Sequence, residues 1–246
     1  MEFAGKVAIV TGGSRGIGRA VAGLLAARGA SLVVVGMDEA RIEATATALG
    51  TAVAVAGDIA RPETAAKAVE AALSRFGRLD ILANIAGAFP TAMLEDTSDA
   101  QFAESIATNL QGTFAFCRAA LPAMRGQGSG AIVNMSSMAA RFPTPGLSVY
   151  GASKAGIEAF TRAIAAEAAP HVRVNAVAAG PTATETVRAL MESDTTGATA
   201  AVTRSLPLGR LATPDEIAEV VLFLASDRAS CMTGQVVHAN CGGVMP

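Results

Sequence analysis

The segment SVYGASKAG, at Ser148 to Gly156, holds the side chains best suited to proton transfer. Tyr150 is the only tyrosine of the chain, and Lys154 follows it by four positions. On an α-helix of about 3.6 residues per turn, these two side chains lie one turn apart on the same face. A nearby ammonium favours the ionised form of a phenol, whose ordinary pKa is about 10. The pair therefore predicts a general acid and base at Tyr150 whose pKa is lowered by Lys154.

A hydroxyl that can reach the same point stands at the end of the apolar run GAIVNMSS, where Ser137 precedes Tyr150 by thirteen positions. Ligands bind at the carboxyl ends of parallel strands, so Ser137 is a candidate partner for the phenol. The alternative is an ordinary helix pair at Tyr150 and Lys154 and a simple loop start at Ser136. A second motif favours the catalytic interpretation.

That motif is TGGSRGIG, at Thr11 to Gly18, between the apolar run KVAIV and a helical pattern. A glycine turn that leads into a helix offers free backbone N–H groups and a partial positive charge to a pyrophosphate. Gly12, Gly16 and Gly18 give the spacing GxxxGxG rather than the usual GxGxxG, and a tight turn without a ligand is the alternative. The position at the first strand–helix junction favours a dinucleotide site.

Seven short apolar runs must position these residues, and helical patterns separate them. The runs lie at 6–10, 31–35, 51–57, 78–84, 130–136, 171–177 and 235–239. They are continuously apolar, as in parallel strands covered on both faces, and Pro62 and Pro214 mark helix starts. We expect an α/β chain with one domain, residues 1–246: a Rossmann-type doubly wound parallel sheet of about seven strands with helices on both faces. The threonine-rich residues 181–206 are expected to form a substrate loop.

The composition excludes several classes of protein. Apolar residues make up 51% and charged residues 16% of the chain, and the formal net charge is −2. No basic field exists to attract nucleic acid. No window approaches the roughly 18 apolar residues that cross a bilayer, so we expect no membrane partner and a cytoplasmic protein. The three cysteines and two histidines have no metal-ligand spacing, so no metal site is expected.

Further motifs occur in a fixed order along the chain. They are Asp58 in GDIA, NIAG at 84–87, Asn109 in TNLQGTF, YGASK at 150–154, and PLGRLATPDEIAEVVLFLASDRASCMTGQ at 207–235. With the glycine loop and Ser137, they make the chain resemble the classical short-chain dehydrogenase/reductase family over essentially its whole length. The resemblance implies an oxidoreductase that interconverts a carbonyl and a secondary alcohol with NAD or NADP.

The resemblance also implies a role for each of four catalytic residues. Tyr150 is the acid and base, and Ser137 orients and polarises the carbonyl. Lys154 binds the nicotinamide ribose and lowers the tyrosine pKa, while Asn109 positions a water in a proton relay. The family pattern further implies a homotetramer that assembles through the helices bearing Asn109 and Tyr150.

A larger set of residues is expected to contact the dinucleotide by the same resemblance. It comprises Gly12, Ser14, Arg15, Gly16, Ile17, Gly18, Gly36, Met37, Asp58, Ile59, Asn84, Ala86, Gly87, Tyr150, Lys154, Gly180, Thr182 and Thr184. Three positions depart from the family pattern. Ile85 replaces a second asparagine, and Ala179 replaces the proline before Gly180. The segment ANCGG, with Asn240 and Cys241, stands where an aspartate followed by two glycines is common.

The end of the second apolar run bears on the choice of cofactor. NAD-preferring relatives have an acidic residue there for the ribose hydroxyls, whereas this chain has Gly36 followed by Met37. Arg15 in the glycine loop can bind the 2′-phosphate of NADP, although Met37 cannot replace the arginine that NADP-binding relatives often have. NADP is therefore favoured and NAD is possible. The alternative for Arg15 is a solvated surface charge.

The substrate side is expected at the segments 86–94 and 140–150, which contain Phe89, Met93, Phe142, Pro143 and Leu147. Each of these side chains alone is as well explained by packing, but the set favours an uncharged apolar ketone or alcohol. One alternative is a reductase of 3-oxoacyl thioesters on acyl carrier protein, which the single arginine in 124–130 disfavours. The other is a non-catalytic dinucleotide-binding regulatory protein, which the intact catalytic set disfavours.

Overall fold

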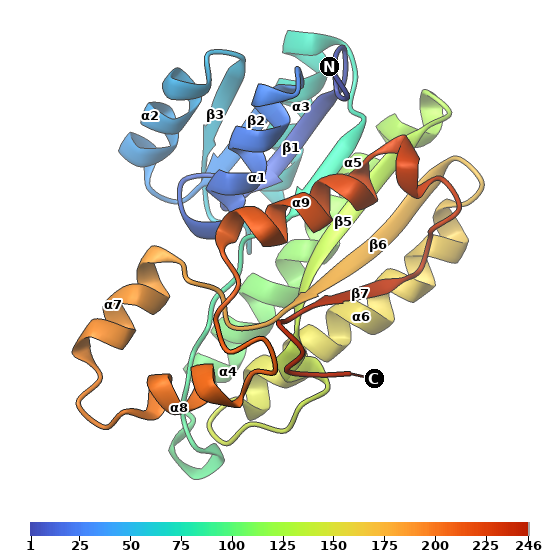
Figure 1. The fold of residues 1–246 in the computed structure, drawn as a ribbon. Helices are drawn as coiled ribbons and strands as arrows, with labels where there is room; N and C mark the ends of the chain where they lie inside the picture. Colours follow the sequence, from blue (N-terminus) through green and yellow to red (C-terminus); the bar gives the residue numbers. More distant parts are fainter. Residues whose placement is uncertain (246) are drawn as a thin grey trace.

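The computed structural model describes residues 1–245, apart from the side chains at positions 190 and 198. The described residues form one parallel seven-stranded sheet in the order β3-β2-β1-β4-β5-β6-β7 (Figure 1). The strands are β1 (Val7–Thr11), β2 (Ser31–Gly36), β3 (Ala52–Ala56), β4 (Ile81–Asn84), β5 (Gly130–Ser137), β6 (Val172–Ala179) and β7 (Val236–Ala239). All seven predicted strands are confirmed, with ends that differ by at most three residues.

The strand order reverses at β1, which pairs with β2 on one side and β4 on the other. The chain first runs outward through β2 to β3 and then crosses back to place β4 on the opposite side of β1. Ligands bind in such a doubly wound sheet at the carboxyl ends of the strands, beside this reversal. The glycine loop follows β1 and therefore lies at this point.

Helices cover both faces of the sheet, as expected for parallel strands. One face is covered by α1 (Gly16–Ala27), α2 (Glu39–Leu49) and α9 (Pro214–Ala225), and the other by α3 (Pro62–Phe76), α5 (Gly112–Gly126) and α6 (Ser148–Ala168). Two of these helices begin as the sequence predicted. Pro62 and Pro214 occupy the first turns of α3 and α9, and Thr213 with Glu216 forms a capping box at α9.

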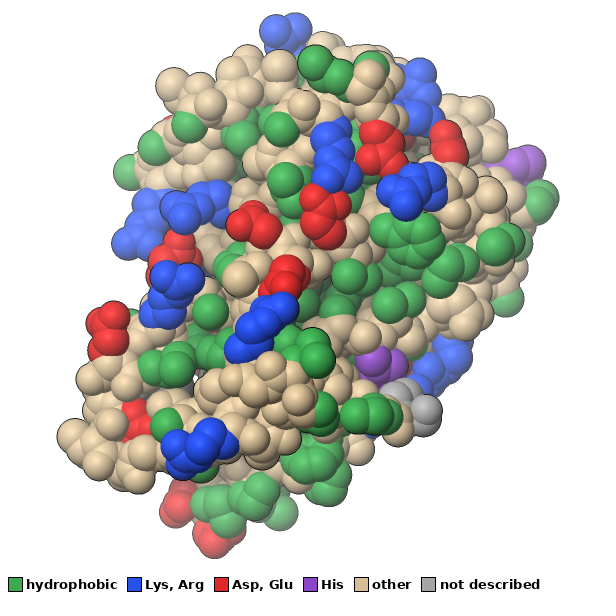
Figure 2. Space-filling model, in the orientation of Figure 1, with side chains coloured by type: hydrophobic (Ala, Val, Ile, Leu, Met, Phe, Trp, Pro, Cys, Tyr) green, Lys and Arg blue, Asp and Glu red, His purple; other side chains and the backbone are tan. Residues whose placement is uncertain are grey.

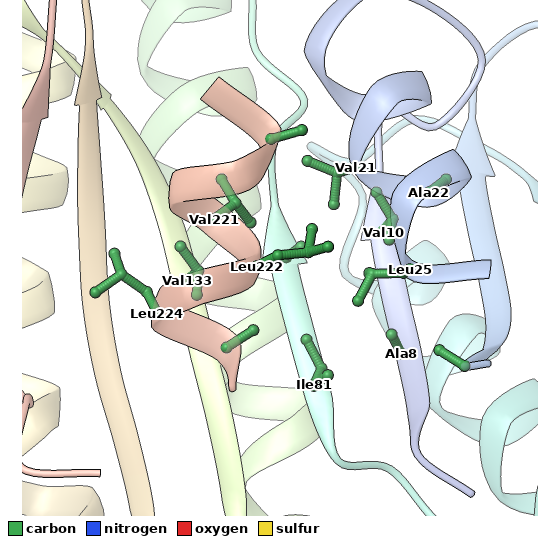
Figure 3. Packing of buried hydrophobic residues seen from close by; sticks show 14 of the residues in the cluster. Ala8, Val10, Val21, Ala22, Leu25, Ile81, Val133, Val221, Leu222 and Leu224 are labelled. Atoms are coloured by element: carbon green, nitrogen blue, oxygen red, sulfur yellow. The ribbon is translucent and has the colours of Figure 1, made fainter. Parts of the chain in front are cut away.

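Each central strand feeds both hydrophobic cores. In β1, Ala8 and Val10 belong to the core beneath α1 and α9, whereas Ile9 belongs to the core beneath α3, α5 and α6. Figure 3 shows Leu25 of α1 and Leu222 of α9 packed over this part of the sheet. Full burial of one leucine side chain stabilises the fold by roughly 1.5–3 kcal/mol. The central strands are therefore a rigid support for the loops at their carboxyl ends.

The segment 181–206 contains two helices, α7 (Glu185–Ser193) and α8 (Ala198–Ser205), where the sequence predicted a substrate loop. Thr184 caps α7, since its hydroxyl accepts a hydrogen bond from the Val187 N–H at 3.3 Å. The segment lies beyond the carboxyl ends of the strands, apart from the helices that flank the sheet (Figure 1). The sequence did not predict these helices because threonine has a low helix propensity.

The surface in view in Figure 2 carries acidic and basic side chains intermixed, without one large patch of either sign. Arg28, directly after α1, forms an ion pair with Glu219 of α9. None of the helices formed by residues 1–245 combines the length and the apolar composition that a bilayer crossing requires.

Candidate active site

Tyr150 and Lys154 lie one turn apart in α6, as their spacing predicted. Lys154 Nζ lies 5.7 Å from the centre of the Tyr150 ring and donates a hydrogen bond to the carbonyl of Met135 in β5 at 2.9 Å. The Lys154 side chain is buried, and burial lowers its pKa to about 8. The ammonium is therefore held beside the phenol at the carboxyl end of β5.

The pKa of Tyr150 shifts in the direction opposite to the sequence-based expectation. Burial of the phenol raises this pKa, and a hydrogen bond with the Ser137 side chain lowers it in part. The Lys154 ammonium, 5.7 Å from the ring centre, leaves the net pKa of the phenol raised. The predicted lowering of the Tyr150 pKa is therefore wrong, because desolvation of the phenol prevails.

Ser137 is the last residue of β5 and precedes a short 3₁₀ helix, η3 (Met138–Ala140). Its Oγ accepts a hydrogen bond from the Ala139 N–H at 3.2 Å. A serine hydroxyl that accepts from the backbone keeps its own proton for donation. Ser137 can therefore donate a hydrogen bond to an oxygen placed beside Tyr150.

Asn109 lies in a π-helical turn (Ile106–Gln111) between α4 (Asp99–Ser105) and α5, and it is fully buried. Its Oδ1 accepts from the Ala88 N–H at 2.9 Å, and its Nδ2 donates to the Ala88 carbonyl and to Ser153 Oγ, each at 3.0 Å. Single π turns within helices are frequent at functional sites. The two contacts with Ala88 hold the loop after β4 against this π-helical turn, and the contact with Ser153 joins the turn to α6.

Gly87 lies between two of the expected catalytic side chains. A Cβ at this position would lie 2.7 Å from Asn109 Oδ1 and 3.3 Å from Lys154 Nζ. The structure thus brings Asn109 and Lys154 together around a glycine. Tyr150 adjoins them through Lys154, and Ser137 adjoins them through its hydrogen bond with Tyr150.

The glycine loop has the shape of an anion cradle. Gly12 and Gly16 have φ of +71° and +53°, in the left-handed region that favours glycine. A Cβ at Gly18 would lie 2.1 Å from the Gly12 carbonyl oxygen, so no larger residue fits there. Helix α1 begins without a side-chain cap from Arg15 and without an acidic residue in its own first turn. Its positive end and the N–H groups that follow Gly16, whose own N–H binds Glu185, therefore fit a pyrophosphate.

The segment after β6 reaches this cradle. The carboxylate of Glu185, at the start of α7, accepts from the Gly16 N–H at 3.0 Å and from Arg19 Nη2 at 2.8 Å. Partial burial raises the pKa of Glu185, but hydrogen bonds from its own backbone and from Gly16, with the charges of Arg19 and Arg15, bring this pKa below its ordinary value. Thr184 contributes its methyl group, 3.2 Å from where a Cβ of Gly16 would stand.

The end of β2 carries no carboxylate at Gly36, and the next side chain, Met37, is 76% exposed. The Arg15 side chain is exposed as well. Asp38 is the nearest acidic residue along the chain, and it caps α2 by accepting from the Arg41 N–H at 3.0 Å. Arg41 Nε lies 3.2 Å from the same carboxylate, so the charge of Asp38 is partly neutralised.

Four further expected cofactor residues surround the first three strands. Ser14 Oγ lies 3.4 Å from where a Cβ of Gly36 would stand, and Ile17 packs against the core beneath α1. Asp58 follows β3 and accepts a hydrogen bond from the Ala60 N–H at 2.9 Å. Ile59 is buried in the core of the opposite face. These residues lie at the strand ends, as expected.

The loop after β4 is held by two polar side chains. Asn84 donates from Nδ2 to Asn134 Oδ1 at 2.9 Å, so the strand keeps its support despite the replacement at Ile85. The Oδ1 atom of Asn84 is buried and has no hydrogen-bond partner among the described residues. The N–H of Ala86 donates to Thr11 Oγ1 at 3.0 Å.

The loop after β6 is fixed at Gly180. A Cβ there would lie 2.6 Å from the Cα of Asn240, so the glycine permits close contact with the C-terminal turn. Thr182 donates from Oγ1 to the Gly180 carbonyl at 2.9 Å. Asn240 holds the turn by donating to the Val244 carbonyl at 3.0 Å, and Cys241 adopts a φ of +54°. The two replacements at 240 and 241 therefore still form an ordered turn.

The expected substrate side is apolar and open. The ring of Phe89 meets the ring of Tyr150 edge to face, with centroids 4.7 Å apart and an interplanar angle of 85°. Phe89, Met93 and Phe142 are 58%, 48% and 47% exposed. An exposed apolar group beside a polar reactive group is typical of a ligand site.

Three residues of the site were not singled out from the sequence: Thr11, Ser153 and Glu185. Thr11 stands inside the glycine motif, so its position was a usable signal. Ser153 contacts a partner 44 positions away and Glu185 one 169 positions away, and no local pattern carries such information.

Comparisons with known proteins agree with this geometry. The family model described as enoyl-(acyl carrier protein) reductase matches residues 12–243. The chain is 37% identical to the 3-oxoacyl-(acyl-carrier-protein) reductase of Escherichia coli, with 100% of both chains covered. It is 39% identical to the short-chain reductase protein NovJ of Streptomyces niveus, with 96% of this chain and 93% of that protein covered.

Solved structures give the same result. A short-chain dehydrogenase/reductase (glucose/ribitol dehydrogenase) from Brucella melitensis superposes with a TM-score of 0.93 at 35% identity, covering 100% of this chain and 99% of that one. Levodione reductase superposes with a TM-score of 0.92 at 32% identity, covering 98% of each chain. The chain therefore belongs to the short-chain dehydrogenase/reductase family and is an oxidoreductase that uses a nicotinamide dinucleotide.

Proposed function

We propose that the protein reduces an uncharged, mainly apolar ketone to a secondary alcohol and catalyses the reverse oxidation. The observation that carries this proposal is the convergence of Tyr150, Ser137 and Lys154 beside Gly87, in the loop that packs against Gly12, next to the exposed ring of Phe89. A nicotinamide, when bound, supplies the hydride that the carbonyl carbon receives.

Tyr150 is assigned the proton transfer. In the direction of reduction its phenol donates a proton to the carbonyl oxygen, and Ser137 donates a hydrogen bond to the same oxygen as it gains negative charge. The raised pKa of Tyr150 keeps the phenol protonated at neutral pH, which suits an acid. The Lys154 ammonium is assigned the partial offset of the desolvation cost of the phenolate that remains, without bringing the pKa of the phenol below its ordinary value, and Asn109 is assigned the positioning of a water that returns the proton.

NADP is the proposed cofactor, with NAD as the alternative. Gly36 and Met37 present no carboxylate to repel a 2′-phosphate, and the exposed guanidinium of Arg15 supplies a charge-assisted contact for it. The pairing of Asp38 with Arg41 supports the same choice, because it reduces the remaining negative charge near the end of β2.

The segment 181–206 is the proposed substrate loop of a single dinucleotide-binding domain. Its contacts with the glycine loop through Thr184 and Glu185 support this assignment. We further propose a cytoplasmic homotetramer. Phe102 of α4 and Phe114 of α5 are 53% and 41% exposed, which supports an interface through these helices. Sedimentation equilibrium tests the assembly, and a monomer at micromolar concentration would refute it.

A reductase of 3-oxoacyl thioesters is the second candidate. The relative from Escherichia coli carries that name, and an acyl chain would find apolar contacts at Phe89, Met93 and Phe142. The segment 124–130, in contrast, contains one arginine, Arg125, and its guanidinium is engaged with the Glu167 carbonyl. We therefore place simple ketones and diketones ahead of the carrier-protein thioester.

A substrate panel separates these candidates. Oxidation of NADPH and of NADH is followed with apolar ketones, diketones and a 3-oxoacyl thioester. A kcat/KM for the thioester far above that for every ketone would support the second candidate. Tight binding of NADPH without turnover on any substrate would instead support a non-catalytic binding protein and would contradict both enzyme assignments.

A further inference from the structure

Glu158 is a buried carboxylate, 3% exposed, that has no part in the proposed proton transfer. It lies in α6, one turn beyond Lys154 and two turns beyond Tyr150. A buried carboxylate persists only where its charge is paired and its oxygens are hydrogen-bonded. The partners of Glu158 therefore indicate what the residue holds in place.

Each carboxylate oxygen of Glu158 binds a different part of the site. Oε1 accepts from the hydroxyl of Ser136 in β5 at 3.1 Å. Oε2 accepts from Arg141 Nε at 3.0 Å, and Arg141 Nη2 lies 3.0 Å from the same oxygen. Arg162 is more distant, at 3.9 Å. Ser136 and Arg141 are therefore joined through one side chain of α6.

These two partners flank the expected catalytic serine. Ser136 directly precedes Ser137, and Arg141 follows it by four positions on the way to Tyr150. Ser136 Oγ also lies 3.3 Å from the Lys154 carbonyl, which adds a second contact between β5 and α6. The first part of the segment that leaves β5 at Ser137 is thus bound to α6 on both sides of the serine.

A fourth element faces this cluster. Burial of His238 in β7 is the largest influence on its pKa and lowers it. The nearby charge of Glu158 raises this pKa, and that of Arg141 lowers it. Its Nδ1 is buried and has no partner among the described residues. A neutral imidazole at this place leaves the Glu158–Arg141 pair as the charged contact that spans the loop.

We propose that Glu158 is a positioning residue that sets the distance between Ser137 and Tyr150 by holding Ser136 and Arg141. This inference rests on the proposed function, because it assigns catalytic roles to those two residues. Arg141 also belongs to the segment 140–150, which is expected to line the substrate side. Loss of the contact is therefore expected to affect catalysis and ketone binding, and to leave cofactor binding unchanged.

The first test is the ionisation of Tyr150, which needs no substrate. The chain has one tyrosine and no tryptophan, so the ultraviolet absorbance of phenolate reports Tyr150 alone. The Ser137 hydrogen bond lowers the pKa of this phenol. Glu158→Gln keeps the shape of the side chain but removes its charge, which by itself would lower the pKa of Tyr150. Displacement of Ser137 should outweigh this effect, so a rise in the pKa of Tyr150 reports the displacement.

The second test is steady-state kinetics with NADPH and the best ketone of the panel. Glu158→Gln and Arg141→Met are each expected to lower kcat roughly tenfold, since small misplacements of reacting groups have effects of this order or larger. The double variant should lose no more than either single one, because both break the same contact. Arg141→Lys, which retains a cation, should restore part of the rate.

Asp80→Asn is the matched control. Asp80 is equally buried and pairs with Arg78 at 2.6 Å, but it lies at the start of β4, at the opposite end of the sheet. The Arg78 and Arg141 side chains are 46% and 41% exposed, so the two pairs are comparable. Asp80→Asn should lower the Tm while leaving kcat and the Tyr150 titration as in the wild type.

Two results would overturn the inference: an unchanged Tyr150 titration in Glu158→Gln, or an equal change in Asp80→Asn. The variant Tyr150→Phe distinguishes a wrong positioning role for Glu158 from a wrong assignment of proton transfer to Tyr150. If Tyr150→Phe is inactive while Glu158→Gln matches the wild type, the positioning role alone is wrong. If Tyr150→Phe retains full turnover, the proposed proton transfer is wrong whatever Glu158 does.

Discussion

The ammonium of Lys154 donates to the carbonyl of Met135 at 2.9 Å and lies 5.7 Å from the centre of the Tyr150 ring. Backbone at the end of β5 thus holds the charge, and the phenol stands beside it. The ammonium is fully desolvated, so its pKa falls to about 8, while the pKa of the buried phenol rises. The fold therefore maintains an unfavourable charge at the site, and measurable consequences follow for stability and rate.

Replacement of Lys154 by methionine is expected to stabilise the fold at neutral pH. The unfolded chain keeps the Lys154 proton up to a pKa of 10.5, whereas the folded chain releases it at about 8. Between these values the unfolded state binds more protons, so the wild-type free energy of unfolding rises with pH. Below pH 8 the buried charge costs on the order of 3 kcal/mol, which Lys154→Met removes.

Urea unfolding at pH 7 and at pH 10 measures this effect. The stability advantage of Lys154→Met should be largest at pH 7 and should shrink at pH 10, where the wild-type amine is already neutral. A variant that is less stable than the wild type at both pH values would show that the Met135 contact outweighs the desolvation of the charge.

The kcat/KM for the cofactor is expected to fall as the pH rises through about 8, because this parameter reports ionisations of the free enzyme and Lys154 loses its charge there. Lys154→Arg keeps a cation throughout this range. The residual kcat/KM of this variant should therefore fall only at a pH above that of the wild-type decline, or should not fall at all. An alkaline limb at the same pH in both proteins would assign the ionisation to another group.

Two glycines of α1 offer a paired test of the cradle. A Cβ at Gly18 would lie 2.1 Å from the Gly12 carbonyl oxygen, whereas a Cβ at Gly23 has nothing within 4 Å. Gly18→Ala should lower the free energy of unfolding by more than about 2 kcal/mol and weaken cofactor binding. Gly23→Ala should raise it by about 0.5–1 kcal/mol, as expected for alanine within a helix. Thermal unfolding and cofactor titration compare the two, and equal effects would contradict the cradle.

Arg15→Ala tests the cofactor preference. Loss of a charge-assisted contact with the 2′-phosphate should weaken NADPH binding roughly tenfold, while NADH, which lacks this phosphate, should bind as before. Fluorescence titration with each nucleotide gives the two affinities. An equal loss for both would make Arg15 a general electrostatic contributor and would remove the main support for NADP.

The fold was predictable from the sequence because the signals are local. Continuous apolar runs such as the one at Val7–Thr11 predict buried parallel strands, and Pro62 and Pro214 mark helix starts. The glycine at position 18 and the four-residue spacing of Tyr150 and Lys154 are local signals as well, and they predicted the glycine loop and the helical pair. The helices in 181–206 were missed because threonine is a weak helix former, so their formation depends on contacts such as the cap at Thr184.

The electrostatics of the site was less predictable, because burial is a property of the whole fold. Spacing placed Lys154 beside Tyr150, but it could not show that the ammonium is desolvated and bonded to Met135. In the same way, Glu158 and Glu185 gave no sequence signal, since each meets partners from distant segments. The carboxylates that hold the site together therefore became visible only in three dimensions.

The measurement that tests the account most directly is turnover of NADPH with the ketone panel by the wild type and by Tyr150→Phe, at equal folded concentration. Phenylalanine keeps the ring and its edge contact with Phe89 but removes the acidic hydroxyl. The account predicts that the wild type reduces at least one apolar ketone and that the variant binds NADPH with unchanged affinity but loses at least about a hundredfold in kcat. Substantial turnover by Tyr150→Phe would contradict the assignment of Tyr150 as the proton donor.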